Sequence, residues 1–241
     1  MVFTSIFLPV RKNRLLGDRI MGLNIVITGT TGMVGEGVLL ECLNNSAVDT
    51  VLSISRRPTG HTHPKLKELH VSEFWDLKEG DDRLRGYDAC FFCAGVSSVG
   101  KNEADFTRLT YDLTLHLAGI LAQLQSGMVF TYVSGKGTDG GDRESGQMWA
   151  KVKRRTEKAL EALPFGAVYH FRPGFMKATE GQLHVLSAYK YFAWLFPVVN
   201  RLAPGWACTL TEVGKAMIRC VTDRPSRHII EVKDIRELAA G

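Results

Sequence analysis

A glycine-rich segment between an apolar strand and a helix constrains this chain more than any other feature of its sequence. Leu23–Thr28 is predicted to be a buried strand, Gly29–Gly35 has the pattern Gly-x-x-Gly-x-x-Gly, and a helical pattern continues to about Cys42. Glycines at this spacing let the backbone turn tightly, approach a pyrophosphate without a Cβ, and pack the helix closely on the strand. The N-terminus of that helix presents free N–H groups and a partial positive charge. The segment therefore predicts a dinucleotide site.

Strands and helices alternate through the rest of the chain. Further apolar runs predict strands at Thr50–Ser55, Leu69–Phe74, Ala89–Ala94, Met128–Ser134, Ala167–Arg172 and His228–Val232. Apolar residues recur every three or four positions from Phe106 to Leu124 and from Met148 to Leu163, which predicts helices. This alternation is typical of a parallel sheet covered by helices. The predicted fold class is α/β: a Rossmann-type doubly wound parallel sheet with helices on both faces and a small C-terminal substrate lobe.

The domain organisation follows from length and composition. The chain has 241 residues, of which 45% are hydrophobic and 23% charged, so a disordered or fibrous class is excluded. No linker or repeat divides it, and we expect one domain over 21–241, with about 175–225 contributing the substrate lobe. Residues 1–20 are expected to be an N-terminal extension. The aromatic stretch Tyr189–Phe196 is expected to pack over the cleft, and a membrane-surface patch is the alternative.

The end of the second predicted strand indicates which dinucleotide is bound. A site that prefers NAD places an acidic residue about 20 positions beyond the glycines, where it holds the ribose hydroxyls. Here Arg56 and Arg57 follow Ser55 instead. Guanidinium groups suit a 2′-phosphate. We therefore predict NADP in preference to NAD, with Arg56 as the first contact and Arg57 as the second; the alternative is a pair of solvated loop arginines.

The five cysteines do not form a disulfide framework. Cys90 and Cys93 have C-x-x-C spacing, but they lie on a predicted strand, where residues three apart face opposite sides. They are therefore expected neither to share a metal nor to pair, and a reducing, cytoplasmic compartment is predicted. No uninterrupted apolar run approaches the roughly 18 residues that a membrane span needs, so no integral membrane segment is expected.

Four short motifs, taken in order, resemble a known family. They are Thr28–Gly35, Ser134–Gly137, Val152-Lys153 and Arg172–Gly174. Together they resemble the atypical short-chain dehydrogenases/reductases labelled NAD(P)-dependent epimerase/dehydratase-like, and they are most similar to the Tat-interacting-protein type of NADP-binding proteins. The likeness extends over about 23–235.

The resemblance implies roles for individual residues. The pyrophosphate would be bound by Gly29, Thr31, Gly32, Met33, Val34 and Gly35. The adenine pocket would be lined by Asp76 and Leu77. The residues that would lie close to the adenosine ribose and to the nicotinamide are Cys93, Ala94 and Gly95. The nicotinamide would be bordered by Arg172, Pro173 and Gly174. Such enzymes also use a Ser after the fifth strand and a Tyr-x-x-x-Lys pair on the next helix.

The sequence departs from that catalytic pattern. Ser134 and Lys153 are present, but Trp149 stands where the tyrosine is expected. An indole N–H donates a hydrogen bond but is not an acid near neutral pH. Three interpretations remain: another proton donor such as Tyr132 or a water, electrostatic action of Lys153 beside a pocket shaped by Trp149, or NADP binding without turnover, as in NmrA-type redox sensors. An oxidoreductase acting on a small carbonyl or alcohol is predicted, and a non-catalytic sensor or scaffold with a protein partner is the alternative.

Weaker signals are given structural interpretations. The basic run from Lys151 to Lys158 is expected to be a solvated helix with Lys153 alone aimed inward, and the net charge of +5 is too small to imply nucleic acid. His61 and His63 are expected to be solvent-exposed, and no metal is predicted. The substrate pocket is expected around Phe175–Lys177 and Tyr189–Phe196, which suggests an apolar or aromatic molecule.

Overall fold

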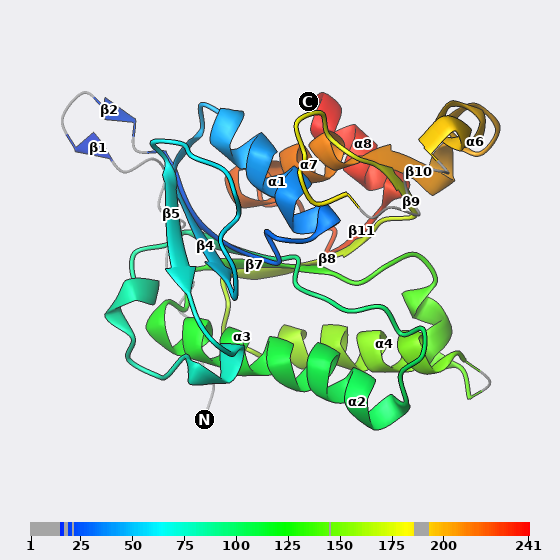
Figure 1. Ribbon diagram of the computed structural model, residues 1–241, viewed down its shortest axis with the longest axis horizontal. Helices are drawn as coiled ribbons and strands as arrows, with labels where there is room; N and C mark the ends of the chain where they lie inside the picture. Colours follow the sequence, from blue (N-terminus) through cyan, green and yellow to red (C-terminus); the bar gives the residue numbers. More distant parts are fainter. Residues whose placement is uncertain (1–14, 17–18, 21, 145, 186–192) are drawn as a thin grey trace, which may run out of the picture.

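The computed structural model describes residues 15–16, 19–20, 22–144, 146–185 and 193–241. A central sheet lies between two layers of helices (Figure 1), as the alternation of strands and helices predicts. Its seven strands are all parallel, in the order β11-β8-β7-β6-β3-β4-β5. Their bounds are β3 Leu23–Thr28, β4 Val48–Ser55, β5 Leu66–His70, β6 Ala89–Phe92, β7 Val129–Val133, β8 Ala167–Arg172 and β11 Ile229–Glu231.

The helices divide between the two faces of the sheet. One face is covered by α1 (Met33–Asn44), α7 (Leu210–Thr222) and α8 (Val232–Ala240), and the other by α2 (Glu103–Thr107), α3 (Leu113–Leu124) and α4 (Met148–Glu161). A π turn over Arg108–Asp112 makes α2 and α3 continuous. None of the described helices is long and apolar enough to cross a membrane.

Alternation along the strands separates two hydrophobic cores. In β3, Ile25 and Ile27 pack beneath α1 and α7, whereas Val26 packs on the side of α3 and α4. In the same way Cys90 lies in the second core and Cys93 at the edge of the first, so the prediction that they face opposite sides is confirmed. All five cysteines are unpaired.

The third strand differs from its predicted bounds. β5 ends at His70, and Phe74–Asp76 forms a 3₁₀ turn instead of continuing the strand predicted over Leu69–Phe74. The cause is local, because Glu73 and Asp76 form a reciprocal capping box that takes the backbone out of the ladder. Other short 3₁₀ helices are Asp82–Leu84, Thr138–Asp142, Ala193–Leu195 and Pro204–Trp206.

The segment predicted to form a small lobe has two parts. β9 (Phe175–Lys177) pairs in parallel with β10 (Ala207–Thr209), and α6 (Phe196–Leu202) projects from the body beside them (Figure 1). By contrast α7 packs against α1 and belongs to the main core. Near the N-terminus, β1 (Leu15–Leu16) pairs with β2 (Arg19–Ile20); the rest of the predicted extension, and 189–192 of the aromatic stretch, lie outside the described residues.

Candidate dinucleotide and catalytic site

The glycine loop joins the carboxyl end of β3 to the first turn of α1, near the middle of the sheet. Gly29 has a φ of +74°, and a Cβ there would lie 2.7 Å from the backbone nitrogen of Ala94, just beyond β6. A Cβ on Gly35 would overlap the carbonyl oxygen of Gly29. Both positions therefore require glycine, and this is what lets the helix approach the strand so closely.

The N-terminus of α1 carries no side-chain cap. Its N-cap is Gly32, and the N–H groups of Met33, Val34 and Gly35 donate to no acceptor within the described residues. The neighbouring strand end is open as well, because a Cβ on Gly95 would meet nothing within 4 Å. Uncapped N–H groups at a helix N-terminus attract phosphate oxygens. The residues present therefore fit the pyrophosphate of a dinucleotide.

The expected adenosine side lies after β4 and β5. Arg56 and Arg57 are exposed, and neither guanidinium pairs with a carboxylate of the described residues. In the 3₁₀ turn after β5, the carboxylate of Asp76 accepts a hydrogen bond from Glu73 N at 2.9 Å. Leu77 is fully buried in the core, so only its backbone can face a ligand.

Ser134 follows β7 and is turned into the protein. Its Oγ donates to Glu157 Oε1 at 2.7 Å and also lies 3.2 Å from the carbonyl oxygen of Phe171. A serine hydroxyl has one proton to donate. Because the Ser134 hydroxyl already donates its one proton to Glu157, it can only accept a hydrogen bond from a ligand.

Lys153 reaches the same strand end from α4. Its Nζ donates to the carbonyl oxygens of Val133 at 3.2 Å and Ser134 at 2.5 Å, and it lies 5.7 Å from the ring centre of Tyr132. Burial lowers the pKa of Lys153 to about 8, against an opposing effect of the Glu157 charge. An ammonium has three N–H groups, so one is left for a ligand.

Trp149 occupies the position expected for tyrosine, one turn before Lys153. Its Nε1 donates to Gln147 Oε1 at 2.5 Å, and a Cβ on Gly137 would lie 3.6 Å from the indole ring. The indole therefore covers the turn after β7. Tyr132, considered as a substitute proton donor, is 1% exposed, and burial raises its pKa. A phenol enclosed in this way cannot reach a substrate in the cleft, so Tyr132 is excluded as the substitute donor, and a water remains the alternative.

Glu157 is the main residue of this region that sequence reasoning missed. It is fully buried, and Arg172 donates to both its oxygens, Nε to Oε1 at 3.0 Å and Nη2 to Oε2 at 2.6 Å. Arg154 adds a bond of 3.0 Å to Oε2. Burial would raise the pKa of Glu157, but the bonds from Arg172 and Ser134 hold it below its ordinary value. Its spacing four residues after Lys153 was the available signal, since such residues share a helix face.

These contacts bear on two expectations. The loop Arg172–Gly174 was expected to border the nicotinamide; the guanidinium of Arg172 points into the core and also lies 3.5 Å from Glu231, so only the backbone of Arg172 can face a ligand. Lys153 was expected to be the only residue of the basic run aimed inward, but Arg154 is also turned inward, with its side chain 20% exposed. The remaining charges are partly neutralised, for example by the 2.5 Å ion pair between Lys158 and Asp142.

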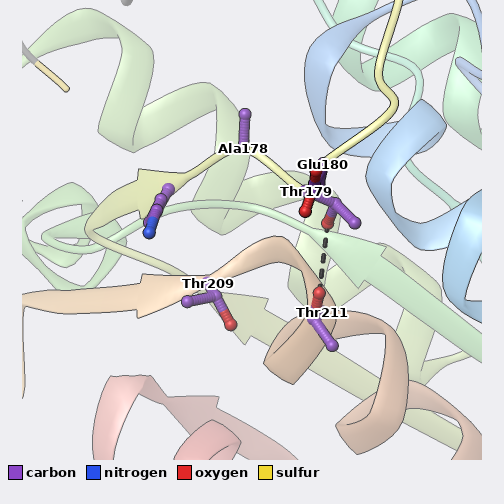
Figure 2. Close-up of a pocket in the computed structure, with 6 residues that line it drawn as sticks. Ala178, Thr179, Glu180, Thr209 and Thr211 are labelled. Carbon is purple, nitrogen blue, oxygen red and sulfur yellow. Dashed lines mark hydrogen bonds between the residues drawn. The ribbon is translucent and has the colours of Figure 1, made fainter.

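A cavity of about 450 Å³ opens beside β9 and β10. It is lined by Lys177, Ala178, Thr179, Glu180, Thr209 and Thr211. Figure 2 shows the hydrogen bond that joins Thr179 to Thr211 in its wall, with the two hydroxyl oxygens 3.2 Å apart. The lining is mostly polar, in contrast to the apolar pocket expected around Phe175–Lys177.

A second buried carboxylate, Glu36, lies directly after the glycine loop. His61 was expected to be exposed, but its side chain is 15% exposed and its Nε2 lies 2.7 Å from Glu36 Oε1. His63, two residues further on, is partly buried and accepts a hydrogen bond from Lys65 N. No group of three or more potential metal ligands occurs among the described residues.

The fold and the glycine loop define a dinucleotide-binding α/β protein. The model of the NAD dependent epimerase/dehydratase family matches residues 25–170, and the chain belongs to this family. The family binds NAD or NADP.

Individual relatives agree with this assignment. The chain is 27% identical over 199 residues to Protein HTATIP2 of Rattus norvegicus, covering 81% of this chain and 79% of that protein. It is 26% identical over 203 residues to Protein fmp52, mitochondrial, of Emericella nidulans, covering 81% and 85%.

Solved structures share the fold at low sequence identity. A short chain dehydrogenase from Burkholderia cenocepacia in complex with NADP has a TM-score of 0.61 at 12% identity, over 91% of this chain and 93% of that one. A UDP-glucuronic acid 4-epimerase from Bacillus cereus in complex with NAD has a TM-score of 0.62 at 12% identity, over 87% and 76%. These neighbours include both cofactors.

Proposed function

We propose that the protein is an NADP(H)-dependent oxidoreductase acting on a small carbonyl or alcohol, with Lys153 serving the substrate oxygen in place of the usual tyrosine. The observation that carries the proposal is the position of Lys153. Its ammonium lies at the carboxyl end of β7 with one N–H uncommitted, and burial lowers its pKa to about 8. A group with a pKa close to neutral pH is suited to move a proton.

The residues of the proposed site have separate roles in the reaction. The reduced dinucleotide, when bound, supplies a hydride to the carbonyl carbon. The N–H groups of Met33, Val34 and Gly35 hold the pyrophosphate, and Lys153 Nζ donates a proton to the carbonyl oxygen as the alcohol forms. The neutral amine is then reprotonated from water. The indole of Trp149 covers the turn after β7 and limits the access of water to the substrate oxygen beside Lys153.

NADP is favoured over NAD by the charges beside the glycine loop. Arg56 and Arg57 are exposed and unpaired among the described residues. A 2′-phosphate would give either guanidinium a charge-assisted partner. We infer that the arginine pair binds it, and that the cavity lined by Thr179 and Thr211 admits a polar substrate.

The proposal is tested by following NADPH oxidation with a panel of aldehydes, ketones and quinones. Lys153→Met should lower turnover about 100-fold, the scale of general acid catalysis, while Lys151→Met, whose ammonium donates to Glu144 O in the exposed loop before α4, should not. Turnover should fall as pH rises above about 8, since the protonated form is the acid. Full turnover in Lys153→Met would exclude this role.

Trp149→Tyr tests the missing relay separately. A tyrosine one turn before Lys153 restores the usual pair, and we expect turnover to rise about tenfold, less than the roughly 100-fold of a full general acid because Lys153 already donates a proton. An unchanged rate would mean that the lysine is not positioned for proton transfer. The variant should leave NADPH affinity unchanged, which fluorescence titration checks.

NADP(H) binding without turnover is the second candidate. It is favoured by the hydroxyl of Ser134, which donates to Glu157 and not toward the cleft, and by the indole in place of a phenol. Tight NADPH binding, no oxidation across the panel, and a protein partner that co-purifies only with one redox state of the cofactor would support a sensor or scaffold.

A reducing, cytoplasmic compartment is proposed from the five unpaired cysteines, of which four are buried. Relatives such as fmp52 of Emericella nidulans are named mitochondrial, so fractionation of cells expressing the tagged protein is the direct test.

A further inference from the structure

Glu36 is a fully buried carboxylate in the first turn of α1, immediately after the last glycine of the loop. Its oxygens accept hydrogen bonds from Leu183 N at 2.6 Å and His184 N at 2.7 Å, and His61 Nε2 donates at 2.7 Å. Burial would raise the pKa of Glu36, but the bonds from Leu183, His61 and His184 bring it below its ordinary value. The carboxylate is therefore ionised, and each of these partners must donate to it.

The contact with His61 fixes the loop that carries the exposed arginines. Ser55 Oγ donates to Arg57 O at 2.7 Å at the start of this loop. Thr59 Oγ1 donates to Glu68 Oε1 at 2.5 Å in its middle. The bond between His61 and Glu36 connects this loop to the first turn of α1, beside the glycine loop, and Lys65 Nζ connects the end of the loop to the C-terminus of α1 by donating to Asn45 O at 2.7 Å. Arg56 and Arg57 thus lie on a short segment held to β4, β5 and α1.

We propose that Glu36, acting through His61, is a positioning residue that sets specificity for the 2′-phosphate of the cofactor. This inference rests on the proposed use of NADP. The 2′-phosphate and the pyrophosphate belong to one molecule, and the adenosine ribose fixes their separation. A ligand can engage Arg56 or Arg57 and the α1 N-terminus together only if the loop is held at the matching distance. Holding it in advance removes an ordering cost from binding.

His61 is a cleaner variant than Glu36. The same carboxylate also accepts the bonds from Leu183 and His184, and a longer one of 3.5 Å from Gln182 Nε2, so replacing Glu36 would disturb the segment after β9 as well. His61→Ala removes the loop contact alone. His63→Ala is a matched control, because His63 lies in the same loop and its side chain accepts a hydrogen bond from Lys65 N, within the loop, and makes no contact with Glu36.

Calorimetric titration of the full chain with NADPH, NADH and adenosine 2′,5′-bisphosphate tests the proposal. We expect His61→Ala to weaken NADPH and the bisphosphate about tenfold and NADH less than about twofold, because only the first two carry a 2′-phosphate. His63→Ala should match the wild type. His61→Gln, whose amide N–H can still donate to Glu36, should restore most of the preference. Melting temperatures confirm that each variant is folded at the titration temperature.

The outcomes separate the two proposals. A wild type that binds NADPH and NADH equally removes the NADP assignment, and the role of Glu36 with it. A wild type that prefers NADPH, together with an unchanged ratio of the two affinities in His61→Ala, overturns only the role of Glu36 and His61. Equal weakening of NADPH and NADH overturns it too, since that result describes a general loss of structure and not a specificity contact.

Discussion

Two buried glutamates lie on opposite faces of the sheet, and their surroundings differ. Glu157, on α4, is compensated by two guanidinium groups, those of Arg172 and Arg154. Glu36, on α1, is compensated mainly by backbone N–H groups and a histidine of two loops. Figure 1 places the two helices in different layers. A charged pair inside the core mainly affects folding, whereas hydrogen bonds from loops mainly fix where those loops lie.

The comparison also separates the two halves of the proposed site. On the Glu36 side, the helix N-terminus and the arginine pair are left without protein partners among the described residues, as a binding site needs. On the Glu157 side, the Ser134 hydroxyl and the Arg172 guanidinium are already committed to the protein. Of these groups on the Glu157 side, Lys153 has an N–H that does not donate to Val133 or Ser134.

Glu157→Gln should have the largest effect on stability. It leaves the buried guanidinium of Arg172 with the more distant carboxylate of Glu231, at 3.5 Å, and removing one partner of a buried pair costs about 3–5 kcal/mol. Urea unfolding measures the loss, and Glu103→Gln, at an exposed position of α2, is the control and should change stability little. A loss below about 1 kcal/mol, the usual scale of a surface pair, would break the comparison.

Glu36→Gln should cost less, about 2 kcal/mol, because the amide keeps one acceptor oxygen and two of the bonds it must replace come from backbone N–H groups. Urea unfolding again measures it. Glu41→Gln on the same helix is the control, since the one hydrogen bond of the Glu41 carboxylate within the part of the chain that the structure describes is a long one, 3.5 Å from Asn45 Nδ2. If Glu36→Gln proves more destabilising than Glu157→Gln, the distinction between a core ion pair and a loop contact is wrong.

Acid should destabilise the protein through both carboxylates. Each has a pKa below its ordinary value of 4.5, so the unfolded chain binds protons first, and the stabilisation present above 4.5 is lost as pH falls through the lower folded values. The slope per group is at most about 1.4 kcal/mol per pH unit. Urea unfolding from pH 6 to 3 should give a shallower slope in either glutamine variant; an unchanged slope in both would contradict this.

Ser134→Ala should have the smallest effect. It removes one hydrogen bond to Glu157, which is worth about 1 kcal/mol, and NADPH affinity should stay within about twofold of the wild type because the hydroxyl points into the protein. Ser98→Ala serves as the control. A large loss of turnover with unchanged stability would instead show that Ser134 acts on a ligand.

Much of the fold was predictable because its signals are local. The strand before the glycine loop has its predicted bounds, and β4, β6, β7, β8 and β11 lie within two residues of theirs. The third strand was misplaced because a capping box between Glu73 and Asp76 outweighed an apolar pattern. We expected an apolar substrate pocket, whereas the cavity beside β9 is polar. The sequence did not predict its lining, because Lys177 and Thr209 are brought together by two strands that are distant in sequence.

The amino-acid sequence by itself determined the glycine loop, the parallel sheet and the exposed arginine pair, since each follows from residues that are neighbours along the chain. Only the tertiary structure decided which charged groups are already used. Glu36 accepts a hydrogen bond from the backbone of Leu183, which is 147 residues away in the sequence. Glu157 on α4 accepts one from Arg172 on β8. Whether a buried carboxylate needs a charged partner or a set of N–H groups depends on what folding places around it, and no spacing rule contains that information.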